Sequence, residues 1–245
     1  MKFATTILFV FILLVLASSA SATDTNYTGQ PGDGELQCLN DVSEYPDYAC
    51  TGGSTLSALT AGTTVRIGQN FSSGNFRRFR TFFAFDTSAV SSATAAQLYF
   101  VFTGDSSTTD FSVLVYSGNG SACWSTTNNA LTTADWNASI TPETGTTFNS
   151  SNYPGNNVGF WWTITSTSVN ADGNTDFKLM SLRDEQNTEP SGNEWVNIAT
   201  QNNATAGYRP LLQITETVIP EYGTLVFVVV LVSSIAIAFA IAKKK

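Results

Sequence analysis

The 245-residue chain contains no histidine, and only 12% of its residues are charged. The lack of histidine excludes Ser-His-Asp and Cys-His catalysis and imidazole metal sites. A charged fraction about half that of an average soluble domain argues against a cytosolic enzyme. The 11 Lys and Arg face 19 Asp and Glu, and this net charge of -8 argues against binding to nucleic acid. We therefore expect neither an enzyme nor a nucleic-acid-binding protein.

Long apolar runs occur only at the two ends of the chain. Residues 1–22 predict a secretory signal peptide, in which Lys2 precedes an apolar run and Ala20-Ser21-Ala22 forms a small-residue cleavage site. An uncleaved N-terminal anchor is the alternative. Residues 223–242 carry no charge and, as a helix, are long enough to cross a membrane. The three lysines at 243–245 then form a cytoplasmic tail, so the sequence predicts a cell-surface protein with its N-terminus outside.

Residues 217–222 are expected to be a linker, which leads into the box Pro220, Glu221, Tyr222 and Gly223. This box, followed by one apolar helix and a basic cluster, resembles the PEF-type C-terminal sorting tails of archaeal surface proteins. Tyr222 stands where that family more usually has Phe. The resemblance implies a sortase-like processing enzyme as a partner, which removes the tail and attaches the protein to the cell surface. A permanent anchor with Tyr222 at the membrane interface explains the same residues.

The segment between the two ends, residues 23–219, is polar and acidic, with seven basic and 18 acidic residues. Its net charge of -11 repels anionic polymers. Six Asn-X-Ser/Thr triplets predict glycosylated surface loops in an exported chain. They begin at Asn26, Asn70, Asn119, Asn137, Asn149 and Asn203.

Three cysteines remain to be placed in this exported segment. Cys38 and Cys50 bracket a short polar loop, and an oxidising compartment favours a disulfide between them. Cys123 is then left over, either as a buried free thiol or as half of an intermolecular bridge. Three cysteines at these spacings, without histidine, do not make a zinc site.

Short apolar or alternating runs recur between Gly, Asn, Asp and Pro, while helical periodicity is missing. This pattern predicts an all-β fold, an antiparallel β-sandwich and most simply a jelly roll. Its 12 Phe and five Trp supply the core. The expected strands are Val65–Ile67, Arg80–Phe85, Gln97–Phe102, Phe111–Tyr116, Phe160–Ile164, Phe177–Leu182, Trp195–Ile198 and Leu211–Ile214.

Several of these runs together resemble DNRLRE domains, with the likeness covering about residues 60–216. An Arg-started strand ends in Phe-Asp, a second strand with small residues and Leu follows, and the last strand contains an aromatic residue and Pro. The matching stretches are residues 80–86, 90–99, 111–116, 123–124, 135–137, 169–177 and 208–214. Residues 23–59, with the Cys38–Cys50 loop, fall outside the likeness and are expected to be a leader or an extra lobe.

The resemblance implies a non-catalytic, secreted jelly-roll module of a type that is often joined to polysaccharide-degrading enzymes or adhesins, and in some cases binds carbohydrate. It also implies that Trp124 and Trp136 lie against the core. No catalytic domain accompanies the module in this sequence, which puts a role in targeting an enzyme to polysaccharide in doubt.

The exposed aromatic residues are the candidates for binding a sugar face. Neighbouring residues of a strand point to opposite faces, so one of Trp161 and Trp162 is expected in the core and the other outside. An outward Trp is unusual and therefore a binding candidate. Trp195, next to a polar run, is a third candidate. Packing under a loop is the alternative for each.

Two polar clusters complete the list of candidate sites. Asn170, Asp172, Asn174 and Asp176 supply the oxygen ligands that a structural Ca²⁺ ion prefers, but the same residues suit a tight turn, which we favour. In the basic cluster, Arg80 is expected to pair with a carboxylate. For Arg77 and Arg78 we favour a solvated loop before an edge strand over a small anion site.

We therefore predict a non-catalytic cell-surface module for glycan binding or adhesion at the cell envelope. Its partners are the membrane, a polysaccharide or surface glycan and a sortase-like enzyme. The alternative is a structural coat or envelope component, or a viral surface protein, that acts by self-association. An exposed aromatic shelf favours the first function, and a smooth apolar edge strand favours the second.

Overall fold

The structure is a computed structural model that describes residues 21–40, 45, 49–51, 54–118, 131–137, 141–143 and 147–218. Within it, Asp24–Glu216 forms one compact unit. Residues 1–20 of the predicted signal peptide, the sorting box, the predicted span at 223–242, Cys123 and Trp124 all lie outside the described residues. In the part that is described, no helix has both the length and the apolar character needed to cross a membrane.

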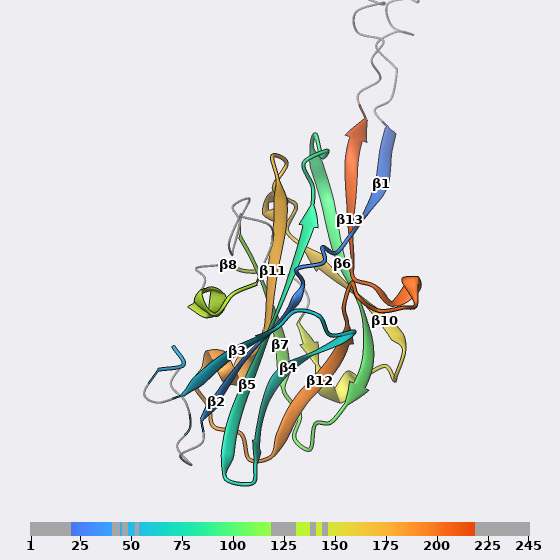
Figure 1. The fold of residues 1–245 in the computed structure, drawn as a ribbon. Helices are drawn as coiled ribbons and strands as arrows, with labels where there is room; N and C mark the ends of the chain where they lie inside the picture. The colour runs from blue at the N-terminus through green and yellow to red at the C-terminus, as the bar shows by residue number, and fades with distance from the viewer. Residues whose placement is uncertain are drawn as a thin grey trace, which may run out of the picture. The chain divides into compact units, whose positions relative to one another are not determined.

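The described chain folds almost entirely into strands with short helical turns between them (Figure 1). The strands are β1 (Ser21–Thr28), β2 (Gly34–Asn40), β3 (Thr55–Leu59), β4 (Thr64–Ser72), β5 (Asn75–Asp86), β6 (Ala93–Asp105), β7 (Ser112–Ser117), β8 (Thr141–Pro142), β9 (Phe148–Asn149), β10 (Val158–Ile164), β11 (Asn174–Ser181), β12 (Asn193–Ala199) and β13 (Leu211–Val218). The helical turns are η1 (Thr133–Asn137), η2 (Ser150–Asn152), η3 (Ser166–Ser168), α2 (Leu182–Glu185) and η4 (Ala206–Tyr208).

All these strands belong to one hydrogen-bonded sheet, with the main path β1-β13-β6-β12-β4-β5-β11-β7-β8. The pairings whose register is defined are antiparallel. Two long strands hold three partners each: β6 pairs with β10, β12 and β13, and β5 pairs with β2, β4 and β11. Sharing long strands between several partners lets a twisted sheet curl over its own face. The all-β prediction is confirmed, and each of the eight predicted runs contributes to a strand.

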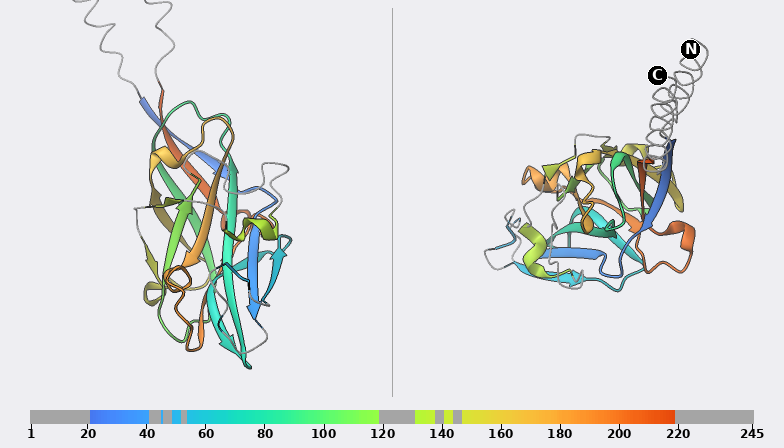
Figure 2. Two further views of the ribbon diagram at one scale, coloured as in Figure 1. Left: turned by 90° about the vertical axis from the view of Figure 1, so that its left-hand side faces the viewer. Right: turned by 90° about the horizontal axis from the view of Figure 1, so that it is seen from above.

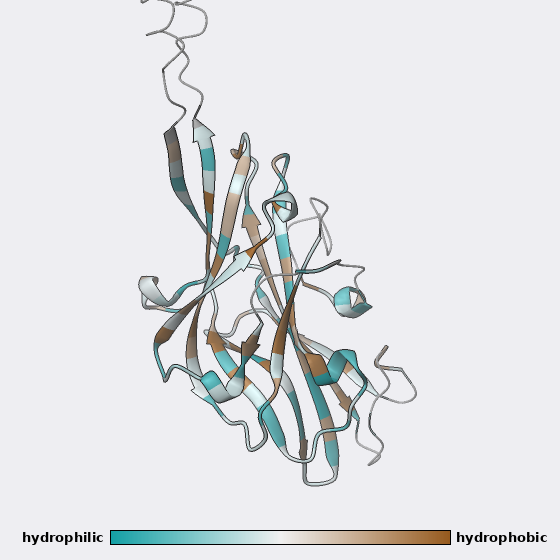
Figure 3. Cartoon of the chain, turned by 180° about the vertical axis from the view of Figure 1, so that it is seen from behind, coloured by the Kyte–Doolittle hydropathy of each residue, from teal (hydrophilic) through white to brown (hydrophobic). Residues whose placement is uncertain are grey.

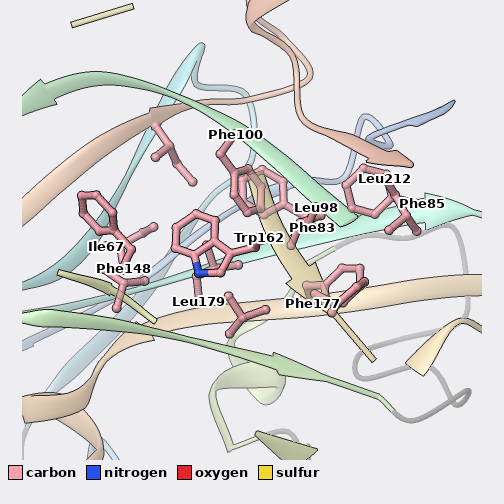
Figure 4. Close-up of a cluster of buried hydrophobic side chains, with 14 of the residues drawn as sticks. Ile67, Phe83, Phe85, Leu98, Phe100, Phe148, Trp162, Phe177, Leu179 and Leu212 are labelled. Atoms are coloured by element: carbon pink, nitrogen blue, oxygen red, sulfur yellow. The ribbon is translucent and has the colours of Figure 1, made fainter. Parts of the chain in front are cut away.

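The main core lies on the inner face of the curl and is strongly aromatic (Figure 4). Phe102 stacks on Phe148 with ring centroids 4.4 Å apart, and Phe160 meets Trp162 edge-on at 4.7 Å. Strands β6, β10 and β13 alternate buried apolar and outward residues, and this alternation is visible as bands of hydropathy in Figure 3. The outward residues of these three strands form the face that carries the candidate site.

A second, smaller core lies against the other face of β5. Leu36 and Cys38 of β2, Phe82 and Ala84 of β5, and Trp136 of η1 are buried together there. Figure 2 shows β2 and β3 beside β5, in agreement with the pairing of β2 with both strands. The predicted disulfide joins Cys38 to Cys50 in this core. Residues 23–59, which the sequence predicts to be a leader or an extra lobe, contribute to strands β1 to β3, and all of them except Thr23 belong to the compact unit.

A buried carboxyl group fixes the turn between β1 and β2. Asp33 is almost fully buried, and its Oδ1 accepts a hydrogen bond from the backbone N–H of Ala84 at 2.9 Å. Burial raises the pKa of Asp33 well above its ordinary value, and the nearby carboxylate of Asp176 raises it further, although backbone hydrogen bonds from Ala84 and Gln30 oppose the rise. The folded protein therefore binds a proton on Asp33 more readily than the unfolded chain does.

We expect Asp33→Asn to flatten the pH dependence of stability. Because the pKa is raised in the folded state, the contribution of Asp33 to stability is full below the ordinary value of 3.8 and is lost as the pH rises towards the folded value. An Asn keeps an oxygen for the Ala84 N–H without the buried charge, so the variant should be more stable than wild type at neutral pH. Urea unfolding at intervals from pH 4 to pH 8 measures this, and parallel curves for the two proteins would contradict it.

Candidate functional site

The adjacent tryptophans of β10 point to opposite faces of the sheet, as strand alternation predicts. Trp162 is only 1% exposed and lies in the aromatic core beside Phe148 (Figure 4). Trp161 is 41% exposed on the outer face. The register of β10 on β6 places Trp161 directly opposite Tyr99. Of the two candidates, Trp161 is therefore the one that a ligand can reach.

Trp161 and Tyr99 form one aromatic shelf across two strands. Their ring centroids are 4.7 Å apart and their planes are inclined by 42°. The Tyr99 ring also covers Gly159, two residues before Trp161, and a Cβ at that position would overlap the ring. Gly159 thus lets Tyr99 lie over the strand, where its ring extends the surface of Trp161.

Uncharged polar side chains border this shelf. In the next outward row, Thr163 of β10 is opposite Gln97 of β6, and Gln97 is opposite Gln213 of β13. The side-chain amide of Gln213 donates a hydrogen bond to Oδ1 of Asn26 on β1 at 3.2 Å. Amide and hydroxyl groups both donate and accept hydrogen bonds, which suits them to sugar hydroxyls. The shelf therefore combines an exposed aromatic surface with neighbouring groups that can donate and accept hydrogen bonds.

The sequence did not single out Tyr99, Gly159, Gln97 or Gln213. Tyr99 lies within the predicted strand Gln97–Phe102, and nothing in the sequence marks Gly159. The missing information was the register, because only the pairing of β10, β6 and β13 brings these residues next to Trp161.

Trp195, the third aromatic candidate, lies elsewhere. It is half-buried on β12, opposite Gly68, and meets the Phe79 ring edge-on at 6.4 Å. Its carbonyl accepts a hydrogen bond from the N–H of Ser106, just beyond β6. Tyr99 is seven residues earlier on that chain, roughly 20 Å away at the rise of a strand. Trp195 and Trp161 therefore do not contribute to one shelf.

The polar stretch at 170–176 forms a hydrogen-bonded turn into β11. The Asn170 side chain accepts from the N–H of Asp172 at 3.1 Å and donates to the carbonyl of Asn174 at 3.2 Å. Asp176 is buried in β11, whereas Asp172 is exposed. Across the described ranges, no group of three or more His, Cys, Asp or Glu side chains is placed to hold a metal ion. The hydrogen bonds are those expected of the turn interpretation.

The arginine cluster does not lie in a solvated loop before an edge strand, and that interpretation was wrong. Arg78 and Arg80 are fully buried on β5, a strand that has partners on both edges. Both bind Asp184 of α2, through Arg78 Nη1 at 2.9 Å and Arg80 Nε at 2.7 Å. Arg80 also lies over the Trp136 ring at 3.9 Å. The cluster is buried because Asp184, more than 100 residues away in sequence, neutralises part of its charge.

The glycosylation triplets are in different surroundings, and several are not in loops. Asn26 is exposed but lies in β1, and Asn137 is exposed in η1. Asn70 lies in β4 with only 9% of its surface exposed. The side chains of Asn149 and Asn203 accept hydrogen bonds from the backbone two residues later, at 2.9 Å each. Asn119 is outside the described residues.

Comparison with models of known protein families and with curated proteins gives no match. The likenesses to DNRLRE domains and to PEF-type tails therefore stay predictions from the residues that carry them.

Proposed function

We propose that this protein is a non-catalytic cell-surface module that binds glycan, or mediates adhesion, through the outward face of β10 and β6. The observation that carries the proposal is the exposed Trp161 ring inclined against Tyr99, with uncharged hydrogen-bonding groups in the next row. A sugar ring presents an apolar face to an aromatic ring and its hydroxyls to the amides beside it.

The proposed setting of this module is the outer surface of the cell. The signal peptide at 1–22 exports the chain, and the helix at 223–242 holds it in the membrane unless a sortase-like enzyme removes the tail. The finer assignment of the curled sheet to a jelly roll of the DNRLRE type belongs to the same proposal. The acidic surface, net -11 over residues 23–219, keeps such a protein soluble.

Replacing Trp161 with Ala is expected to weaken glycan binding at least tenfold, because the variant loses the stacking surface. A tenfold change corresponds to about 1.4 kcal/mol. The measurement is binding of the full-length protein to a glycan array, followed by titration with the best glycan. Phe71→Ala is the matched control, since Phe71 is a similarly exposed aromatic residue (39%) on β4 that stacks on Phe76. Wild-type affinity in Trp161→Ala would rule out the site, and affinity lost in Trp195→Ala would move it to β12.

A second function, self-association as a structural coat component, is favoured by strand β3. Among the described residues β3 pairs only with β2, four of its five residues are exposed, and Leu59 is 47% exposed. The sequence has no charge between Asp47 and Arg66. Natural edge strands are commonly protected by charges or Pro, and an uncharged edge is open to pairing with another strand. A second copy of β3 in antiparallel register is the partner this edge fits.

If the edge is used, Ser57→Lys should convert an oligomer of the wild-type protein into a monomer, because the added charge opposes edge-to-edge pairing. Sedimentation equilibrium at micromolar concentration measures the mass, and Ala206→Lys, in the exposed turn η4, is the control for an added charge. A monomeric wild-type protein, or oligomers unaffected by Ser57→Lys, would count against this function.

A further inference from the structure

The outward-facing residues of the sheet are arranged in rows, and these rows restrict the class of glycan that the proposed site accepts. Two parallel rows cross the strands here. The first consists of Trp161, Tyr99 and Leu211, and the second of Thr163, Gln97 and Gln213. We call these six residues the outer strip. From them we propose that the ligand is an uncharged, extended polysaccharide chain that lies across β10, β6 and β13; this inference rests on the proposed function.

The charge of the outer strip excludes acidic sugars. None of its six residues is charged, so no Arg or Lys in the strip can pair with a uronate carboxylate or a sulfate. In the next row, Thr215 donates a hydrogen bond to the exposed carboxylate of Asp24 at 2.7 Å. The nearest charge in that direction is therefore negative, as is the net charge of the surrounding domain. On the other side, Arg209 lies two residues before Leu211 and donates a hydrogen bond to the carbonyl of Asn203 at 3.0 Å. The strip itself offers an anionic chain no cation, whereas a neutral chain needs none.

The shape of the outer strip selects an extended chain over a single sugar. Neighbouring strands are about 4.8 Å apart, so each row covers roughly 10 Å. The rows are about 7 Å apart, which is two residues along a strand. Rings in one row and hydrogen-bonding groups in a parallel row provide an apolar contact and a polar contact for successive sugars. A chain that crosses the strands contacts both rows through successive sugars, whereas a single sugar contacts only one position of the strip.

Gly159 has a positioning role in this site. The Tyr99 ring lies over Gly159, and any side chain there would displace the ring from the shelf. Gly159→Ala should therefore weaken binding to the same extent as Tyr99→Ala, although Gly159 itself offers no side chain to a ligand. Circular dichroism and the thermal midpoint of Gly159→Ala establish that the variant is folded, so that a loss of binding reports the displaced ring.

The test is affinity electrophoresis of the full-length protein in gels that contain either a neutral polysaccharide (xylan, mannan or mixed-linkage β-glucan) or an acidic one (alginate or polygalacturonate). We expect retardation by at least one neutral polymer and by neither acidic polymer. Titration with saccharides of the retarding polymer should give at least tenfold tighter binding for the hexasaccharide than for the monosaccharide. Gln97→Ala and Gln213→Ala should each bind the glycan about tenfold more weakly, because each variant loses one hydrogen bond to it. Gln186→Ala, an exposed glutamine after α2, is the matched control.

The outcomes separate this inference from the function on which it rests. Trp161-dependent retardation by alginate or polygalacturonate would overturn the neutral class and leave glycan binding in place. Equal affinities for the monosaccharide and the hexasaccharide would overturn the extended chain. Retardation that persists in Trp161→Ala, or no retardation by any polymer, would overturn both the inference and the proposed function.

Discussion

Replacing Asp184 with Asn is expected to lower the free energy of unfolding by about 3–5 kcal/mol, the cost of leaving buried charges without their partner. Asp184 is fully buried and is the carboxylate shared by Arg78 and Arg80, which are fully buried as well. Arg80 binds it through two atoms, with Nε donating to Oδ2 at 2.7 Å and Nη2 donating to Oδ1 at 3.0 Å. An Asn has nearly the same size and keeps one acceptor, but it does not carry the negative charge.

Urea unfolding measures this loss, and Glu189→Gln is the control. Glu189 is exposed, so removal of its charge should change stability by no more than about 0.5 kcal/mol. The N-cap of α2 should be kept in the variant, because Ser181 Oγ accepts a hydrogen bond from the Asp184 backbone N–H at 2.9 Å and this bond does not need the carboxylate. The loss of stability therefore reports the ion pairs and not the helix cap. A loss below about 1 kcal/mol in Asp184→Asn would mean that the two arginines find other partners.

Removal of the Cys38–Cys50 disulfide is expected to lower the free energy of unfolding by about 3 kcal/mol. The bridge joins residues 12 apart in sequence, and closing a loop of about this size contributes roughly that amount by restricting the unfolded chain. The loop carries Tyr45, whose hydroxyl donates to Gln69 at 2.6 Å and whose ring lies under Arg78 at 4.1 Å. Loss of the bridge should therefore also loosen the contact between the Tyr45 ring and the buried Arg78.

The measurement is urea unfolding of the double variant Cys38→Ala, Cys50→Ala, in which Cys123 is unchanged. Wild-type protein unfolded in reductant is the matched comparison, and the two should agree because both lack only this bridge. If the double variant were as stable as oxidised wild type, the bridge would have no stabilising role.

Most of the sheet could be predicted from the sequence because its strands keep a local signature. The eight predicted runs contain branched or aromatic residues at alternate positions, and all of them contribute to strands β4 to β7 and β10 to β13. Strand β2, Gly34–Asn40, gave no such signal. Its Glu35 looks like a surface residue, but it is buried beside Arg66, whose Nη2 lies 2.7 Å from Glu35 Oε1. A charge that is neutralised by a distant residue cannot be recognised from its own segment.

The candidate site could be predicted only in part. Strand alternation required that one of Trp161 and Trp162 point outward, but it did not say which. Prediction of the shelf also required the strand registers. The pairing of Trp161 with Tyr99, and of Thr163 with Gln97 and Gln213, depends on registers between segments up to about 115 residues apart. The burial of Arg78 and Arg80 could not be predicted for the same reason, since their partner Asp184 lies in a different part of the chain.

The most direct test of the glycan-binding shelf is the response of the tryptophan indole N–H signals in the NMR spectrum of full-length protein during titration with a neutral hexasaccharide. Trp161→Phe assigns the Trp161 signal. The account predicts that this signal shifts in proportion to occupancy, while the signals of the buried Trp136 and Trp162 change little. A saturable shift at Trp195 with none at Trp161, or no shift with any neutral glycan that the protein binds, would contradict the account.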